Sequence, residues 1–173
     1  AGIADLAECI HISATDIQGL LDFALAQQID LTVVGPESSL AEGIVDLFEE
    51  RGLRIFGPSK KAAILEGSKV FSKEFMKKYN IPTAEFEVFT DAGQAKAYID
   101  RCGAPVVVKA DGLAAGKGVI VPSNDAETEA AIRSTAILGP FVLEQHLTGP
   151  ECSLLALCDG VTAVALPLAQ DHK

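Results

Sequence analysis

Short apolar runs alternate with amphipathic stretches over the first sixty residues. Apolar side chains recur at helical spacing over 17–26, directly after Asp16, a residue type favoured at helix N-caps. Apolar runs at 31–34 and 53–56 predict strands, and the stretch 40–51 between them predicts one helix. Strands that alternate with helices at this spacing are typical of a parallel sheet with right-handed crossovers.

The pattern then changes toward helices and an antiparallel sheet. Two helices are predicted between Ser59 and Tyr79, the second capped by Ser68. A strand at 85–89 and a helix that begins after Asp91 follow. The remaining predicted elements are a strand at 105–109, a strand at 119–121, a helix from Asp125 to about Arg133, a strand at 141–145, and strands at 153–158 and 162–168 joined by a turn at Asp159-Gly160.

The stretch 104–122 is the most informative part of the chain. Two predicted strands flank a loop that is rich in glycine and alanine, so backbone amides can approach an anion closely. Lys109 ends the first strand and Lys117 lies in the loop, which places two cations beside this backbone. We interpret the stretch as a phosphate-binding β-hairpin, although a flexible hairpin with solvated lysines has the same composition. It is not a Walker A loop, because Gly118 and a β-branched strand follow Lys117 in place of Ser or Thr and a helix.

The amino-acid composition of the chain excludes some classes of protein. The 173 residues are 49% hydrophobic and 22% charged, which is a globular composition of one ordinary or two small domains. No apolar run reaches the roughly 18 residues of a membrane span. The net charge of −10 argues against a general nucleic-acid binder. The four cysteines lack zinc-site spacing, so we expect reduced, mostly buried thiols in a cytoplasmic protein.

A few charged residues stand at positions that favour ligand chemistry. Lys69 is in the first turn of a predicted helix, where the helix dipole disfavours a cation unless an anion lies nearby. Glu144 and Glu151 are seven residues apart around a predicted strand end, and Glu37 follows an earlier strand. Each of these could equally be an ordinary solvated charge. The three histidines have no partner pattern that indicates a nucleophilic triad, so we assign no catalytic side chain.

Several segments, in order along the chain, resemble one enzyme family. These are VVGPE, FGPSKKAAILEGSKVFSKEFM, IPTAEFEVFTD, PVVVKADGLAAGKGVIV, FVLEQHLTGPECS and PLAQDHK. They are similar to the glycinamide ribonucleotide synthetases, or phosphoribosylamine–glycine ligases, of the ATP-grasp superfamily. The resemblance implies an α/β Rossmann-like N-terminal domain (1–67), a linker helix of the central domain (68–83), an α+β ATP-grasp lid subdomain (84–149) and the start of the central catalytic subdomain (150–173).

The resemblance also implies an activity and a set of site residues. The family joins glycine to 5-phosphoribosylamine and splits ATP to ADP and phosphate through glycyl phosphate. Lys69 and Lys109 match the lysines that hold the ATP phosphates, and Glu151 matches the acid that binds the ribose hydroxyls. The remaining matches are the lid loop (Gly112, Gly116, Lys117, Gly118), the adenine hinge (Glu144, Gln145, Leu147) and, more weakly, the phosphoribosylamine side (Gly35, Pro36, Glu37, Asp171, His172, Lys173).

The chain departs from the family pattern in four places. The family begins about one strand–helix unit before Ala1, and its Mg²⁺ ligands lie beyond Lys173, so we assign no metal ligand here. The stretch 132–141 is shorter than in the family, so we expect the helix to stop at Arg133 and a loop to be missing before Ile137. Ser39 stands where the family usually has proline.

Two other functions stay open at this point. One is a different purine-pathway ATP-grasp ligase, such as an aminoimidazole ribonucleotide carboxylating enzyme. The other is a nucleotide-binding module without catalysis. These two hypotheses and the ligase hypothesis all involve small-molecule partners, and none of them involves a nucleic acid or a membrane.

Overall fold

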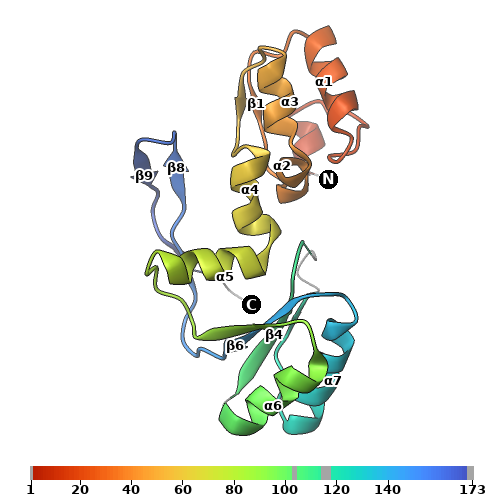
Figure 1. Ribbon diagram of the computed structural model, residues 1–173. Coiled ribbons are helices and arrows are strands. Elements are labelled where there is room, and N and C mark those ends of the chain that lie inside the picture. The colour runs from red at the N-terminus through yellow and green to blue at the C-terminus, as the bar shows by residue number, and fades with distance from the viewer. Residues whose placement is uncertain (1, 103–104, 114–117, 171–173) are drawn as a thin grey trace.

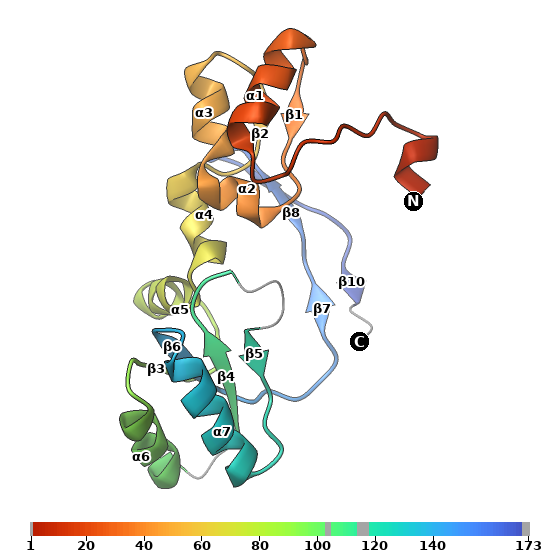
Figure 2. The ribbon, with the colours of Figure 1, turned by 90° about the vertical axis from the view of Figure 1, so that its right-hand side faces the viewer.

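The computed structural model describes residues 2–102, 105–113 and 118–170, and its elements fall into three regions (Figure 1). An N-terminal α/β region leads through α4 and α5 to a second region built on an antiparallel sheet. The last strands, β7 to β10, then follow, and β7 and β10 lie on the side of the molecule away from α5 (Figure 2). No helix in these ranges is long and apolar enough to cross a membrane.

The N-terminal region contains a short parallel sheet covered by helices. Its elements are the 3₁₀ helix η1 (Gly2–Asp5), α1 (Ile17–Ala26), β1 (Thr32–Val33), α2 (Glu37–Glu42), α3 (Ile44–Glu50) and β2 (Ile55–Phe56). β1 pairs with β2 in parallel, Thr32 opposite Ile55, which confirms the predicted strand–helix–strand unit. The Asp16 side chain accepts a hydrogen bond from the Gly19 amide (3.0 Å), as its predicted N-cap role requires. Helices α1 and α3 supply the buried core: Leu21, Ala24, Ile44, Val45 and Phe48.

The single helix predicted over 40–51 is wrong. The structure has two helices, α2 and α3, because Gly43 takes a left-handed conformation (φ 96°) and ends the first of them. Ser39, the departure from the family pattern, is buried within α2 and donates a hydrogen bond to the Ala14 carbonyl (2.6 Å). This contact ties α2 to the segment before α1.

Helices α4 (Lys60–Gly67) and α5 (Lys69–Lys78) connect the two main regions, and both begin after a serine cap, of which Ser68 was predicted. Ser59 accepts a hydrogen bond from the Ala62 amide and Ser68 accepts one from the Phe71 amide. The aromatic residues of α5 stack on one another along the helix, with centroids 6.2 Å apart for Phe71 and Phe75. The buried residue of α5 is instead Lys73, at 8% exposure.

The second region is an antiparallel sheet in the order β3-β6-β4-β5. Its elements are β3 (Phe86–Phe89), α6 (Ala92–Cys102), β4 (Val106–Ala110), β5 (Val119–Ile120), α7 (Asp125–Ala136) and β6 (Phe141–Gln145). The pairing of β4 with β5 confirms the predicted hairpin. Helices α6 and α7 pack on one face of the sheet, and the core between them includes Phe89, Ala95, Val108, Ile132, Phe141 and Leu143.

Helix α7 corrects the prediction of a break after Arg133. It begins after Asn124, whose side chain accepts from the Glu127 amide, and it continues to Ala136. Thr135 is buried in the sheet-facing side of the helix, and Ser134 Oγ donates to the Ala131 carbonyl (3.0 Å). Tertiary burial of Thr135 offsets the low helix propensity of Ser-Thr.

The two strands predicted at 153–158 and 162–168 are replaced by four shorter strands, which form two separate pairs. β7 (Cys152–Ser153) pairs with β10 (Ala169–Gln170), whereas β8 (Ala156–Cys158) pairs with β9 (Ala163–Ala165) across the predicted turn at Asp159-Gly160. The expectation of mostly buried thiols is wrong, since all four cysteines are free and exposed. Cys152 and Cys158 lie on these exposed strands, and Cys102 ends α6.

Candidate functional site

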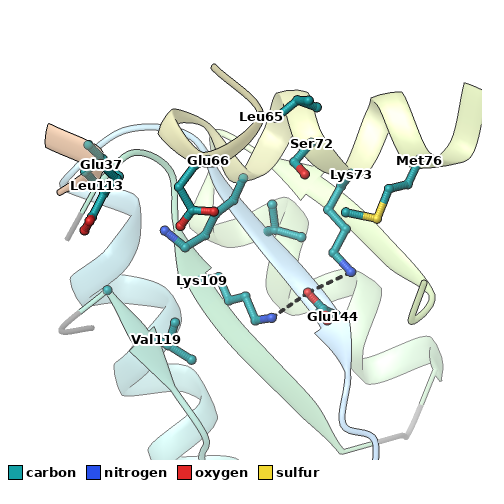
Figure 3. Close-up of a pocket in the computed structure, with 13 residues that line it drawn as sticks. Glu37, Leu65, Glu66, Ser72, Lys73, Met76, Lys109, Leu113, Val119 and Glu144 are labelled. Atoms are coloured by element: carbon teal, nitrogen blue, oxygen red, sulfur yellow. Dashed lines mark ion pairs between the residues drawn. The ribbon is translucent and has the colours of Figure 1, made fainter. Parts of the chain in front are cut away.

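A cavity of about 330 Å³ lies between α5 and the sheet face opposite α6 and α7 (Figure 3). Side chains alternate across a strand, so Val108 and Leu143 face the core while Lys109, Val142 and Glu144 face α5. The lining residues come from α2, α4, α5, the β4–β5 hairpin and β6: Glu37, Leu65, Glu66, Lys69, Ser72, Lys73, Met76, Lys109, Leu113, Gly118, Val119, Val142 and Glu144.

Two lysines share one carboxylate at the inner wall of this cavity. Glu144 Oε2 lies 3.0 Å from Lys73 Nζ and 2.9 Å from Lys109 Nζ. Figure 3 shows Lys73 reaching down from α5 and Lys109 reaching across from β4 toward this carboxylate. Because Glu144 and Lys109 lie on neighbouring strands and Lys73 on the helix above, the ion pairs join the helix to the sheet.

The shared carboxylate oxygen is buried between the two ammonium groups. Glu144 Oε2 lies at ion-pair distance from both lysines, which supply its counter-charge. Burial of a carboxylate is costly unless it is paired, so loss of both lysines would leave this atom without compensation.

A second set of contacts fastens the hairpin to the start of α5. The Asp111 carboxylate accepts hydrogen bonds from Ser68 Oγ (3.0 Å) and from the Val70 amide (3.1 Å). Lys69 Nζ donates to the Gly112 carbonyl (2.7 Å). The start of α5 is therefore next to an anion, as the position of Lys69 predicts, but in this structure the anion is the Asp111 side chain.

The structure brings together part of the predicted site. Lys69, Lys109, Gly118 and Glu144 all line the cavity, and so does Glu37, the first residue of α2. Gly112 has a positive φ (87°) and accepts from Lys69. The following predicted residues do not line the cavity: Gly35, Pro36, Gln145, Leu147 and Glu151. The other predicted residues lie outside the described ranges: Gly116, Lys117, Asp171, His172 and Lys173.

Sequence reasoning missed Lys73 and Asp111. Lys73 is four residues after Lys69, and this spacing places both side chains on one face of α5, a signal that could have found it. Asp111 directly follows the strand that carries Lys109, but nothing in the sequence indicates that it caps a helix 41 residues earlier.

Comparison with known proteins identifies the family. The phosphoribosylglycinamide synthetase N domain matches residues 1–66, and the ATP-grasp (A) domain of the same enzyme matches 67–173. The chain belongs to the phosphoribosylglycinamide synthetase family. Its mixed α/β fold is that of the ATP-grasp ligases found among similar solved structures.

Named relatives agree with this family. A phosphoribosylamine–glycine ligase of Halalkalibacterium halodurans is 49% identical over 99% of this chain and 42% of its own length. One from Escherichia coli (strain K12) is 48% identical over 95% of this chain and 40% of its own. The chain therefore spans about two fifths of the length of these curated relatives.

Solved structures support the same fold. A phosphoribosylamine–glycine ligase from Thermotoga maritima covers 97% of this chain, which corresponds to 41% of that protein, with a TM-score of 0.72 at 30% identity. An ADP complex of an N5-carboxyaminoimidazole ribonucleotide synthetase covers 98% of this chain and 45% of its own, with a TM-score of 0.76 at 19% identity. The second likeness concerns the fold alone.

Proposed function

We propose that this chain supplies the N domain and part of the ATP-grasp domain of a ligase that joins glycine to 5-phosphoribosylamine. The products are glycinamide ribonucleotide, ADP and phosphate, with glycyl phosphate as the intermediate. The observation that carries the proposal is the match of both family domains along residues 1–173, together with curated relatives named phosphoribosylamine–glycine ligases. The free thiols of its cysteines support a cytoplasmic location.

The cavity between α5 and the sheet has the chemistry that ATP requires. Lys69 and Lys109 supply cations at one wall, which suits phosphate groups. Met76, Val119 and Val142 supply apolar surface for a base. Glu144 lines the cavity, and we assign it to the adenine hinge together with Gln145 and Leu147. The residues present therefore fit the nucleotide.

The fit to Mg²⁺ is different. The described ranges contain no group of three or more His, Cys, Asp or Glu side chains that could hold a metal ion. We therefore propose no Mg²⁺ ligand among these residues and derive no step through the metal.

The chain's own residues would act by binding and charge neutralisation. Bound ATP supplies the phosphoryl group that activates the glycine carboxylate. Lys69 and Lys109 would neutralise and orient its phosphates, and the β4–β5 hairpin would cover them, since phosphoryl transfer depends mainly on positioning and electrostatics. Glu151 would bind the ribose hydroxyls. Gly35 to Glu37, at the end of β1, and 171–173 would serve the phosphoribosylamine side.

The proposal is tested by ADP release from ATP in the purified full-length protein. We expect release that requires glycine and phosphoribosylamine together, and bicarbonate in place of glycine should not support it. We also expect Lys109→Ala to weaken ATP binding by at least about tenfold, the loss of one charge-assisted phosphate contact.

A matched control variant separates an error in the placement of the phosphate site from an error in the ligase assignment. Lys96→Ala removes an exposed lysine that pairs with Asp100 on α6, away from the cavity, and should leave ATP binding unchanged. Equal ATP affinities for Lys109→Ala and the unaltered protein would show that the phosphate site is misplaced. ADP release that ignores glycine would instead overturn the ligase assignment while leaving the nucleotide site intact.

A further inference from the structure

The two lysines that share Glu144 differ in how firmly they are held. Resting on the proposed nucleotide site, we propose that Lys73 is a positioning residue for Lys109. Lys73 keeps a cation on the buried Glu144 carboxylate, so that Lys109 can leave this carboxylate and bind the phosphates of an incoming nucleotide. Lys73 itself does not contact the phosphates.

Contacts from three directions hold Lys73 in place. Its ammonium lies 3.0 Å from Glu144 Oε2, donates to Thr83 Oγ1 (2.6 Å) and stands 5.6 Å from the centre of the Phe86 ring. The side chain is 10% exposed. Each of the three partners comes from a segment other than α5, so moving this ammonium would break an ion pair, a hydrogen bond and a cation–π contact together.

Lys109 is held less firmly. Its side chain is 27% exposed, it lines the cavity, and the contact recorded for its ammonium among the described residues is the ion pair with Glu144 at 2.9 Å. A lysine side chain that is held by a single ion pair has fewer contacts to break on reorienting than Lys73 has. Lys109 is therefore the lysine that can leave Glu144 at the smaller cost.

Charge balance gives the two lysines different roles. In this structure two cations flank the single carboxylate of Glu144, so this carboxylate has one lysine more than it needs as a counter-ion. When Lys109 moves to a phosphate, Glu144 keeps Lys73 and no buried carboxylate is left without a counter-ion. Without Lys73, Glu144 would hold Lys109 as its remaining partner, and a phosphate would have to compete with it for that lysine.

The experiment measures binding of inorganic triphosphate and of ATP to the purified full-length protein by calorimetry. We expect Lys73→Met to weaken triphosphate binding by about tenfold. We expect the same Lys73→Met change to have little effect in the E144Q background, because no carboxylate then competes for Lys109. Lys73→Arg should keep near-normal binding, since it retains a cation beside Glu144.

Lys77→Met is the matched control. Lys77 is one turn further along α5 and stands over the same Phe86 ring at 5.7 Å, but its ammonium is not in the Glu144 ion pair. We expect this variant to bind triphosphate normally. Thermal unfolding of each variant shows whether it is folded, and the Lys73→Arg variant still tests the proposal if Lys73→Met does not fold.

Each other result overturns the proposal in a distinct way. An equal loss from Lys73→Met with and without Glu144→Gln would mean that Lys73 contacts phosphate itself or acts on the fold. Normal binding by a folded Lys73→Met, or a loss with Lys73→Arg as large as with Lys73→Met, would remove the positioning role and leave the proposed function intact. Failure of the unaltered protein to bind either ATP or triphosphate would overturn the nucleotide site and this inference together.

Discussion

The β3-β6-β4-β5 sheet and the C-terminal strands have similar apolar sequences but different surroundings. Leu143 on β6 is 1% exposed, whereas Leu157 on β8 is 51% exposed. Strand β6 lies between β3 and β4, with α5 on one face and a core shared with α6 and α7 on the other. Figure 2 shows β7, β8 and β10 along one side of the molecule, apart from α6 and α7.

The comparison separates two effects of the same residue pattern. Apolar and β-branched residues favour extended backbone in both regions, and both form antiparallel ladders. A core forms at the β3-β6-β4-β5 sheet because two helices present apolar faces to it. Burial of Leu143 should therefore stabilise the fold far more than the presence of Leu157.

The largest expected effect comes from replacing leucine by alanine once in each region, at Leu143 and at Leu157. Leu143→Ala should lower the free energy of unfolding by about 2–5 kcal/mol, from lost burial and the cavity that remains. Leu157→Ala should change it by less than about 0.5 kcal/mol, as for an exposed site. Urea unfolding of the full-length protein measures both values. A loss of several kcal/mol for Leu157→Ala would show that β8 is covered in the full-length protein.

An intermediate effect concerns the link between the β4–β5 hairpin and α5. Asp111→Ala removes the acceptor for Ser68 Oγ and the Val70 amide, and should cost about 1–2 kcal/mol, the range for loss of a helix cap. Hydrogen exchange should show the Val70 amide losing protection. Asp100→Ala, which removes an exposed carboxylate paired with Lys96, is the control and should cost less than about 0.5 kcal/mol. Unchanged protection of Val70 would refute a capping role for Asp111.

The smallest expected effects come from two exposed carboxylates, one in each region. Backbone hydrogen bonding from Ser123, with the Asn124 side chain, lowers the pKa of Glu127. The amides of Thr162 and Val161 lower the pKa of Asp159 in the β8–β9 turn. A lowered pKa in the folded state stabilises the fold above the pKa of the unfolded state, and this contribution disappears as pH falls through the folded-state pKa.

The two carboxylates should differ in what they stabilise. Glu127→Gln should slightly lower the melting temperature at pH 7, by less than about 2 °C, and the difference from the unaltered protein should vanish at acidic pH. Asp159→Asn should leave the melting temperature nearly unchanged and speed hydrogen exchange at Thr162, because an exposed hairpin opens locally. A pH-independent difference for Glu127→Gln would assign its effect to something other than the carboxylate charge.

Local signals predicted much of the secondary structure. Asp16 and Ser68 cap helices as expected, since their side-chain acceptors serve amides only three residues ahead. The β4–β5 hairpin was also predictable from two apolar runs around a glycine-rich loop. The helix break at Gly43 was missed because apolar periodicity continues across it. The end of α7 was missed because burial of Thr135 outweighed its weak helix propensity.

Some features of the candidate site were likewise predictable from local sequence, and others were not. Long motifs in their order along the chain were enough to identify the family and to single out Lys69, Lys109 and Glu144 as candidates for ligand chemistry. That Glu144 pairs with two lysines, and that Lys73 is the buried residue of α5, became clear from the folded arrangement. The folded arrangement also decided that the Asp111 carboxylate accepts from the first turn of α5. The reason is physical: capping and strand formation depend on neighbours a few residues away, whereas the pairing of buried charges depends on which helix face meets which strand.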